Sequence, residues 1–180
     1  MTASVSTWSG PFIARATVEL RMQVKSRHHL RSDDITTIRE EIADGLGVDI
    51  DGDQFELVEF VDADYEVVLV DDDPMVFYVD EDPFLTVRGA NDHDPQTGVV
   101  VVDAGAVSFV SDGADVMRPG IVKADHEIRA DDLVVIAEAT HGKVLAVGRA
   151  LVDGDDMVGD SGKVVASIHH VGDDLYEFAI

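Results

Sequence analysis

Val99-Val-Val-Val-Asp-Ala-Gly-Ala-Val-Ser-Phe-Val-Ser-Asp-Gly-Ala-Asp-Val-Met-Arg-Pro-Gly-Ile121 is the stretch that decides the fold of this 180-residue chain. Its first four residues are an apolar run that predicts a short buried strand. From Ala106 to Val110, apolar side chains fit one face of a short helix, which Asp112-Gly113 ends. Arg118-Pro119-Gly120 has the residue order of a type II turn and leads into another strand. The unit would expose backbone N–H groups at its corners.

The rest of the C-terminal half continues as short strands separated by glycine turns. A turn is predicted at Thr140-His141-Gly142-Lys143 and an acidic loop at residues 153–161. Spacing of about 8–12 residues between such strands is typical of a small closed β structure. We therefore predict a small closed barrel over residues 97–180, with strands at 132–137, 144–152 and 163–168.

Residues 22–96 predict a separate, small α+β domain. Ser32-Asp33-Asp34 offers an N-cap to a helix that Gly45 and Gly47 would end. The helix presents Ile35, Ile38, Ile42 and Leu46 at helical spacing. Strand-like runs follow at 54–60, 65–70 and 75–79, then an apolar piece at 84–87 and a polar linker at 91–96. One helix with several antiparallel strands gives the fold class α+β.

The first 21 residues differ from the remainder in composition. Glu19 is their one acidic residue, whereas the whole chain carries 37 acidic residues in 180. Met22 offers an alternative start. We expect residues 1–21 to be either an extension or a mis-assigned start.

The formal net charge of −24 is spread along the chain rather than gathered in a tail. Uniform acidity favours adaptation to very high salt, as in a haloarchaeal cytosol, because hydrated carboxylates keep the surface soluble. At molar salt the Debye length is about 3 Å, so net charge barely repels RNA beyond contact. Cysteine is absent, and no signal segment or long apolar run occurs. We expect a soluble, cytoplasmic protein without a membrane partner.

Patterns that would indicate metal or acid–base chemistry fail on inspection. His169 and His170 are adjacent on a predicted strand, so they point to opposite faces and cannot share one metal ion. Residues 49–60 begin like a calcium loop but carry Gln54 at the glycine position and Phe60 at the glutamate position. Acidic pairs such as Asp155-Asp156 are expected as solvated surface in so acidic a chain. We predict no enzyme activity, cofactor or metal.

Several motifs, in order, resemble a PUA domain (pseudouridine synthase and archaeosine transglycosylase domain). They are V-V-V-D-A-G-A-V-S-F-V from Val100, G-A-D-V-M-R-P-G-I-V from Gly113, A-V-G-R-A from Ala146 and G-K-V-V-A-S-I-H-H-V-G-D from Gly162. The stretch Arg27-His-His-Leu-Arg-Ser-Asp-Asp-Ile35 resembles the start of the pre-PUA domain that precedes it. The chain is thus identified as an archaeal relative of the malignant T-cell-amplified-sequence translation factors, over residues 22–177.

The resemblance implies a PUA-type β pseudo-barrel for residues 97–180 and a non-enzymatic RNA-binding protein of translation. Eukaryotic relatives act on the small ribosomal subunit in re-initiation and recycling, near the initiator tRNA and beside a partner with an SUI-type domain. RNA, as tRNA or rRNA, is therefore the expected partner, with an SUI-domain protein as a possible second one. An accessory role in tRNA or rRNA modification and a protein-interaction adaptor are the alternatives.

Candidate RNA contacts follow from the cations and from the PUA resemblance. Residues 40–96 hold 19 acidic residues and one base, Arg88, so that segment makes a poor RNA platform. Basic residues gather before and after it, and in PUA domains RNA lies on the first helix, the following glycine loop and the last strand. Each candidate also has a plain structural interpretation, as a solvated charge or a turn glycine. The candidates are Arg27, His28, Arg31, Gly105, Gly113, Ala114, Arg118, Lys123, Arg149, Lys163 and His169.

Overall fold

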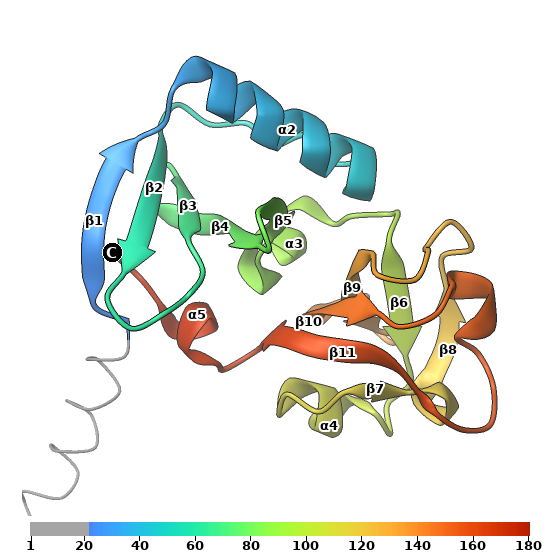
Figure 1. The fold of residues 1–180 in the computed structure, drawn as a ribbon. Helices are drawn as coiled ribbons and strands as arrows, with labels where there is room; N and C mark the ends of the chain where they lie inside the picture. The colour runs from blue at the N-terminus through green and yellow to red at the C-terminus, as the bar shows by residue number, and fades with distance from the viewer. Residues whose placement is uncertain (1–21) are drawn as a thin grey trace, which may run out of the picture.

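The computed structural model describes residues 22–180, so the expected extension, residues 1–21, lies outside the described residues. Two β sheets sit side by side (Figure 1). The first is an antiparallel meander in the order β1-β2-β3-β4-β5. Its strands are β1 (Val24–His29), β2 (Phe55–Phe60), β3 (Val67–Val70), β4 (Asp73–Val79) and β5 (Asp82–Leu85). β1 was not predicted, because its residues are mostly exposed and polar.

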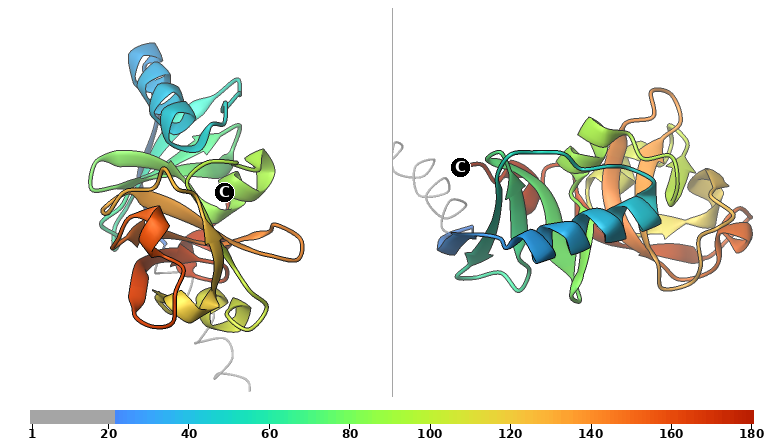
Figure 2. Two further views of the ribbon diagram at one scale, coloured as in Figure 1. Left: turned by 90° about the vertical axis from the view of Figure 1, so that its right-hand side faces the viewer. Right: turned by 90° about the horizontal axis from the view of Figure 1, so that it is seen from above.

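Helix α2 (Ser32–Leu46) lies across this sheet, as the view from above shows (Figure 2). Its buried residues Ile38, Ile42 and Leu46 are four apart and therefore share one face. Gly47, with φ of 69°, ends the helix as predicted. The predicted N-cap is wrong: Arg31 occupies that position and makes no side-chain cap hydrogen bond.

Two tight hairpin turns of the first sheet are made of acidic residues. Asp71 and Asp72 join β3 to β4, while Asp80 and Glu81 join β4 to β5. All four residues have positive φ, between 48° and 75°. Such two-residue turns favour Asn, Asp and Gly, which tolerate the left-handed region. The three aspartates therefore suit these positions, whereas Glu81 is strained.

The predicted polar linker at 91–96 is helical over its first three residues. Helix α3 (Val87–His93) begins where the Thr86 hydroxyl accepts a hydrogen bond from the Gly89 N–H at 3.0 Å. The apolar piece at 84–87 is split between β5 and α3. Gly89 is required here, because a Cβ would lie 2.3 Å from the Met75 carbonyl oxygen.

The second sheet has six strands in the order β7-β11-β10-β9-β6-β8. All pairs are antiparallel except β6 with β9. This near-closed sheet, with α4 and α5, confirms the predicted α+β class with a pseudo-barrel. Its elements are β6 (Val99–Val102), α4 (Val107–Ser111), β7 (Val116–Met117), β8 (Ile121–Ala124), β9 (Leu133–Glu138), β10 (Val144–Ala150), β11 (Lys163–His170) and α5 (Asp174–Glu177), with the 3₁₀ turns η1 (Arg118–Gly120) and η2 (Gly154–Asp156).

The type II turn predicted at Arg118-Pro119-Gly120 is instead the 3₁₀ turn η1. Gly120 does not adopt positive φ, contrary to what such a turn would need. It is needed for packing, because a Cβ would lie 2.9 Å from the Ala106 Cβ. The helix α4 and the stop at Gly113, with φ of 92°, are confirmed.

Helix α3 joins the two sheets. The Asn91 side chain donates to the Val144 carbonyl at 3.1 Å and accepts from the Val144 N–H at 2.8 Å. His169, only 2% exposed, accepts from the Val87 N–H through Nε2 at 3.1 Å. One hydrophobic cluster holds buried residues of both sheets, among them Phe77 and Val147. A second cluster, which includes Val100 and Val164, lies within the second half alone. The halves are thus joined by shared core residues, and the division into residues 22–96 and 97–180 stays a prediction.

Candidate nucleic-acid interface

Residues of α4, β7 and η1 line a small apolar groove. Helix α4 and strand β7 lie at the bottom of the second half in Figure 1. Its volume is about 290 Å³, and Phe109, Met117 and Pro119 are among its lining residues. Phe109 is 66% exposed and Met117 is 49% exposed, although both are large and apolar. Exposed apolar side chains around a hollow indicate a binding surface rather than a packing defect. We call this feature the α4 groove.

The backbone beside the α4 groove is held by His170. Its Nδ1 lies 3.0 Å from the Ser111 carbonyl oxygen and 2.9 Å from the Val171 carbonyl oxygen. Both neighbours are acceptors, so Nδ1 must carry the proton. The ring packs under Gly113, where a Cβ would lie 2.7 Å from Nε2. Gly113 is therefore required both for its positive φ and for this contact.

Gly105 and Ala114, two of the predicted RNA contacts, lie before and after helix α4. Gly105 lines the α4 groove, and the neighbouring Asp103 carboxylate accepts the Ala106 N–H at 3.0 Å. The Ala114 N–H donates to the Phe109 carbonyl at 3.0 Å, which closes the end of α4. The chain thus shapes the corner with its own backbone hydrogen bonds.

Arg118 has a structural task in the second half. Its Nε donates to the Asp156 carbonyl at 2.8 Å, and a terminal nitrogen donates to the Ser161 carbonyl at 2.9 Å. Two glycines make room for the side chain: a Cβ on Gly159 or Gly162 would lie 3.0 or 2.7 Å from it. Arg118 therefore ties the acidic loop to η1, and two of its donor nitrogens are already occupied.

The remaining predicted cations of this half differ in their surroundings. Lys163 pairs with Asp115 at 3.2 Å, beside the α4 groove. The Ser167 N–H and this ammonium outweigh burial and lower the pKa of Asp115 below its ordinary value. Lys123 is exposed on β8, with no ion pair in the described part of the chain. Lys163, beside the groove, is thus paired with a carboxylate, whereas Lys123, on the edge strand β8, has no ion pair in the described part of the chain.

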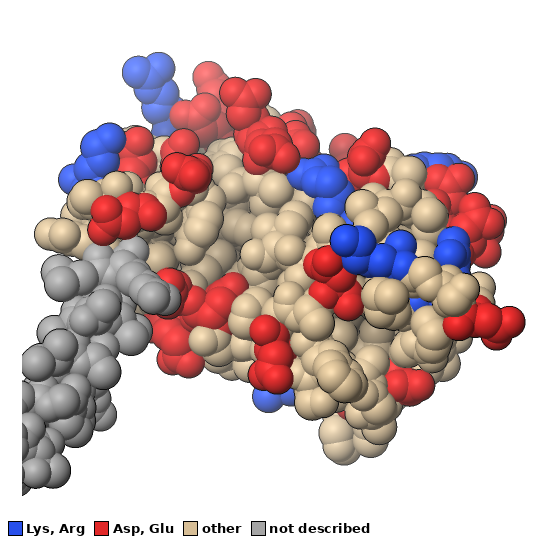
Figure 3. Space-filling view, turned by 60° about the horizontal axis from the view of Figure 1, so that its bottom comes forward, with Lys and Arg blue, Asp and Glu red and all other residues tan. Residues whose placement is uncertain are grey.

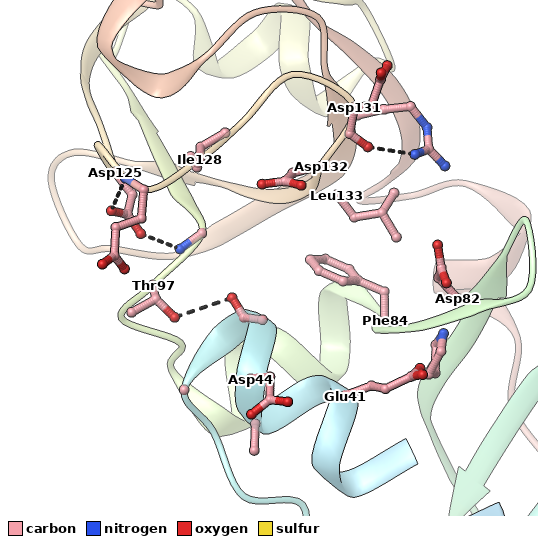
Figure 4. Close-up of a pocket in the computed structure, with 17 residues that line it drawn as sticks. Glu41, Asp44, Asp82, Phe84, Thr97, Asp125, Ile128, Asp131, Asp132 and Leu133 are labelled. Atoms are coloured by element: carbon pink, nitrogen blue, oxygen red, sulfur yellow. Dashed lines mark hydrogen bonds between the residues drawn. The ribbon is translucent and has the colours of Figure 1, made fainter. Parts of the chain in front are cut away.

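Arg149 lies in a different place, an acidic groove of about 570 Å³ between the two halves (Figure 4). Its guanidinium donates to the Asp131 carbonyl at 2.7 Å and pairs with Asp80 at 3.1 Å. Phe84 and Leu133 supply apolar lining. The carboxylates around it are Glu41, Asp44, Asp82, Asp125, Glu127, Asp131 and Asp132. These carboxylates would repel the phosphates of RNA. Arg149 does not line the α4 groove, so the structure does not bring it together with the other predicted contacts there.

The basic stretch before α2 lies at the far end of the molecule from α4 (Figure 1). Arg27 forms two hydrogen bonds to Glu56, at 2.8 and 2.7 Å, and one to Asp72 at 2.7 Å. These contacts raise the pKa of Arg27 and lower that of Glu56. His28 and Arg31 are exposed. The predicted contacts before α2 and those beside the α4 groove therefore lie at opposite ends of the molecule.

His169, predicted to face RNA, is instead buried at the junction of the halves. Its Nδ1 lies 2.8 Å from the Asp173 carboxylate, and its ring meets Phe77 edge-on at 5.3 Å between centroids. Of the adjacent pair, His169 is buried and His170 is half-buried. Sequence reasoning missed Phe109, Met117 and His170 as site residues. The apolar pattern of residues 106–110 placed Phe109 on the buried face of the helix, whereas the structure leaves it 66% exposed.

Charges are mixed around the α4 groove. Figure 3 shows an uncharged area on the lower part of the second half, flanked by acidic and basic side chains. No cluster of three or more potential metal ligands occurs among residues 22–180. Within that range, no helix is long and apolar enough to cross a membrane.

The fold and its corner groove define the class: a PUA-type pseudo-barrel behind a small α+β domain. Residues 98–172 match the family model described as PUA domain. Residues 26–87 match a model described as Domain of unknown function (DUF1947). An uncharacterised protein of Methanocaldococcus jannaschii is 36% identical over 160 residues, which cover 87% of this chain and 99% of that protein.

Solved structures and translation proteins agree with this assignment. A hypothetical protein of Pyrococcus horikoshii has a TM-score of 0.76 at 33% identity, covering 84% of this chain and 98% of that one. A conserved PUA domain protein of Thermoplasma acidophilum has a TM-score of 0.73 at 30% identity, covering 84% and 97%. Translation machinery-associated protein 20 of Eremothecium gossypii is 28% identical over 53% of this chain and 56% of that protein. The chain belongs to this family of PUA proteins with a pre-PUA domain, which confirms the resemblance.

Proposed function

We propose that this chain is a non-enzymatic RNA-binding protein of translation, which acts on the small ribosomal subunit near tRNA. The observation that carries the proposal is the α4 groove with its two exposed apolar side chains, Phe109 and Met117. PUA domains as a class support RNA as the ligand, and the similarity to translation machinery-associated protein 20 supports translation as the process.

Base stacking is the main source of affinity in this proposal. An unpaired base can lie on the Phe109 ring, because stacking on an aromatic face contributes about 1–3 kcal/mol per base. Groups near Gly113 and Lys163 would then position the sugar and phosphate. Stacking depends little on salt, whereas phosphate contacts weaken as salt rises. A site with one exposed aromatic ring and few free cations is therefore suited to a cell interior of high ionic strength.

Filter binding in molar KCl tests the proposal. We expect the full chain to bind rRNA or tRNA fragments with unpaired ends, and substitution of Phe109 to weaken that binding. Retention of no RNA above the level of an unrelated acidic protein would contradict the proposal.

The SUI-domain partner implied by the family is part of the same proposal. A pull-down of the full chain from native lysate, with and without nuclease, separates direct from RNA-mediated association. We expect an SUI-domain protein to remain after nuclease treatment. If nuclease treatment removes the SUI-domain protein together with the RNA, then RNA links the two proteins. That result would contradict direct docking.

A further inference from the structure

The first sheet ends in a strand edge that no described residue covers. β1 pairs with β2 on one side and has no neighbour on the other within residues 22–180. The register pairs Arg27 with Val58 and His28 with Leu57, and the Leu30 N–H donates to the Phe55 carbonyl at 2.9 Å. Backbone groups alternate in direction along an antiparallel ladder. Those of His28 and Leu30 therefore point to β2, while those of Arg27 and His29 point outward.

This edge is accessible over its whole length. Five of the six residues of β1 are exposed, and the sixth, Ser26, is intermediate. A bulge lies between Val24 and Ser26, so the regular part of the ladder runs from Ser26 to His29. Arg27 is held by Glu56 and Asp72, which fixes its side chain toward its own sheet. Two outward-pointing residues thus offer two N–H donors and two carbonyl acceptors to a further strand.

The charges around β1 select what can pair with it. Lys25, His28 and Arg31 are exposed and have no ion pair among the described residues. The segment 40–96 has the opposite composition, with 19 acidic residues and one basic residue. Like charges opposite each other destabilise a strand pair. A second copy of β1 would set basic against basic, whereas an acidic strand would be complementary.

The open backbone groups of β1 favour a peptide strand as the occupant of this edge. The exposed large apolar side chains at this end of the sheet, Val24 and Val61, are aliphatic. The exposed His28, His29 and Arg31 side chains have planar groups on which a base could stack, so RNA is the competing occupant that the test must exclude. Aliphatic contacts together with open backbone groups are the elements of strand addition.

We propose that the outer edge of β1 docks an extended acidic segment of a partner protein, which adds to the first sheet as a further strand. The four outward backbone groups of Arg27 and His29 hold the segment. Lys25, His28 and Arg31 favour acidic side chains on it. The surface is remote from the α4 groove, so protein and RNA can be bound at the same time.

Amide hydrogen exchange by NMR tests the proposal on the full chain. The probe is a blocked peptide of alternating Glu and Val, added at millimolar concentration in the lowest KCl that keeps the native fold. We expect exchange of the Arg27 and His29 amides to slow about tenfold, because each enters a new hydrogen bond. The His28 amide, already bonded to β2, should change little. A peptide with Lys in place of Glu should bind at least about fivefold more weakly.

A pair of variants separates backbone pairing from side-chain effects. His29→Pro removes one outward N–H, a change that edge strands tolerate, whereas His29→Ala keeps it. We expect His29→Pro to weaken peptide binding about tenfold and His29→Ala to leave it nearly unchanged. Equal affinities would overturn the proposal, as would unprotected Arg27 and His29 amides in the wild-type chain at saturating peptide. A single-stranded RNA decamer that displaces the peptide and contacts β1 without protecting these amides would assign the edge to RNA instead.

Discussion

Phe109→Ala is the substitution that separates RNA binding from folding most cleanly. The ring is 66% exposed and borders the α4 groove, so little of its apolar surface is buried in the protein alone. We therefore expect the free energy of unfolding to change by less than about 1 kcal/mol. Loss of one stacked base removes about 1–3 kcal/mol of binding free energy, or about 5- to 150-fold in Kd.

The assay is filter binding of an rRNA or tRNA fragment at several KCl concentrations up to the molar range. Because stacking is nearly independent of salt, the fold-loss in affinity should stay constant as KCl rises. Val122→Ala is the matched control, since Val122 is 51% exposed on β8 and does not line the α4 groove. An unchanged Kd for Phe109→Ala, or equal losses in both variants, would refute the stacking argument.

Further predictions concern stability and the shape of the site. Glu81→Gly should stabilise the protein by about 0.5–1 kcal/mol, seen as a higher Tm, because Glu81 has φ of 75°; an unchanged Tm would count against backbone strain in this turn. Gly113→Ala should lower both the Tm and the affinity for RNA, since a Cβ would lie 2.7 Å from the His170 ring. An unchanged affinity would show that RNA does not contact this corner. His169→Ala should lower the free energy of unfolding in urea by about 2–4 kcal/mol, because it leaves the buried Val87 N–H without an acceptor and removes the side-chain partner of the Asp173 carboxylate, which keeps two backbone N–H donors. Burial alone would raise the pKa of Asp173, but the hydrogen bond and charge of His169 and two backbone N–H groups lower it on balance. The resulting stability should be present above the ordinary aspartate pKa of about 3.9 and should fade as the pH falls through the lower native value, more weakly in Asp173→Asn; identical acid unfolding curves would contradict this.

Much of the second half could be predicted because its signals are local. The apolar run at Val99 and the Asp112-Gly113 stop each specify a strand end or a helix end by themselves. The same is true of Gly47 after α2. Hydrophobic periodicity and glycine therefore placed these elements correctly, since they depend on few distant contacts.

Elements that depend on tertiary contacts were missed. β1 has little apolar character and exists as a strand because β2 supplies its hydrogen bonds. Helix α3 contains Gly89 and Asn91, weak helix formers, and is held by Thr86 and by Val144 of the other half. Propensity is a weak prior when distant residues supply the stabilising contacts.

The residues of the candidate site also divide into those that local sequence signals located and those whose position depends on tertiary contacts. Gly105 lines the α4 groove and Lys163 pairs with Asp115 at its side, while Gly113 and Ala114 follow the end of α4. Arg118 was chosen from its charge and the PUA resemblance, and Arg149 from its charge. Neither signal can show that carbonyl groups of the same chain already engage the guanidinium groups. His169 was assigned to the surface by analogy, whereas α3, which the sequence did not predict, buries it.

Ultraviolet crosslinking of the native protein to RNA in high-salt lysate, with both the RNA and the crosslinked peptide identified, tests the central claim most directly. The account predicts rRNA or tRNA sequences attached within residues 105–117, next to Phe109. Crosslinks confined to other surfaces, or RNA recovery no greater than that of an unrelated acidic protein, would contradict it.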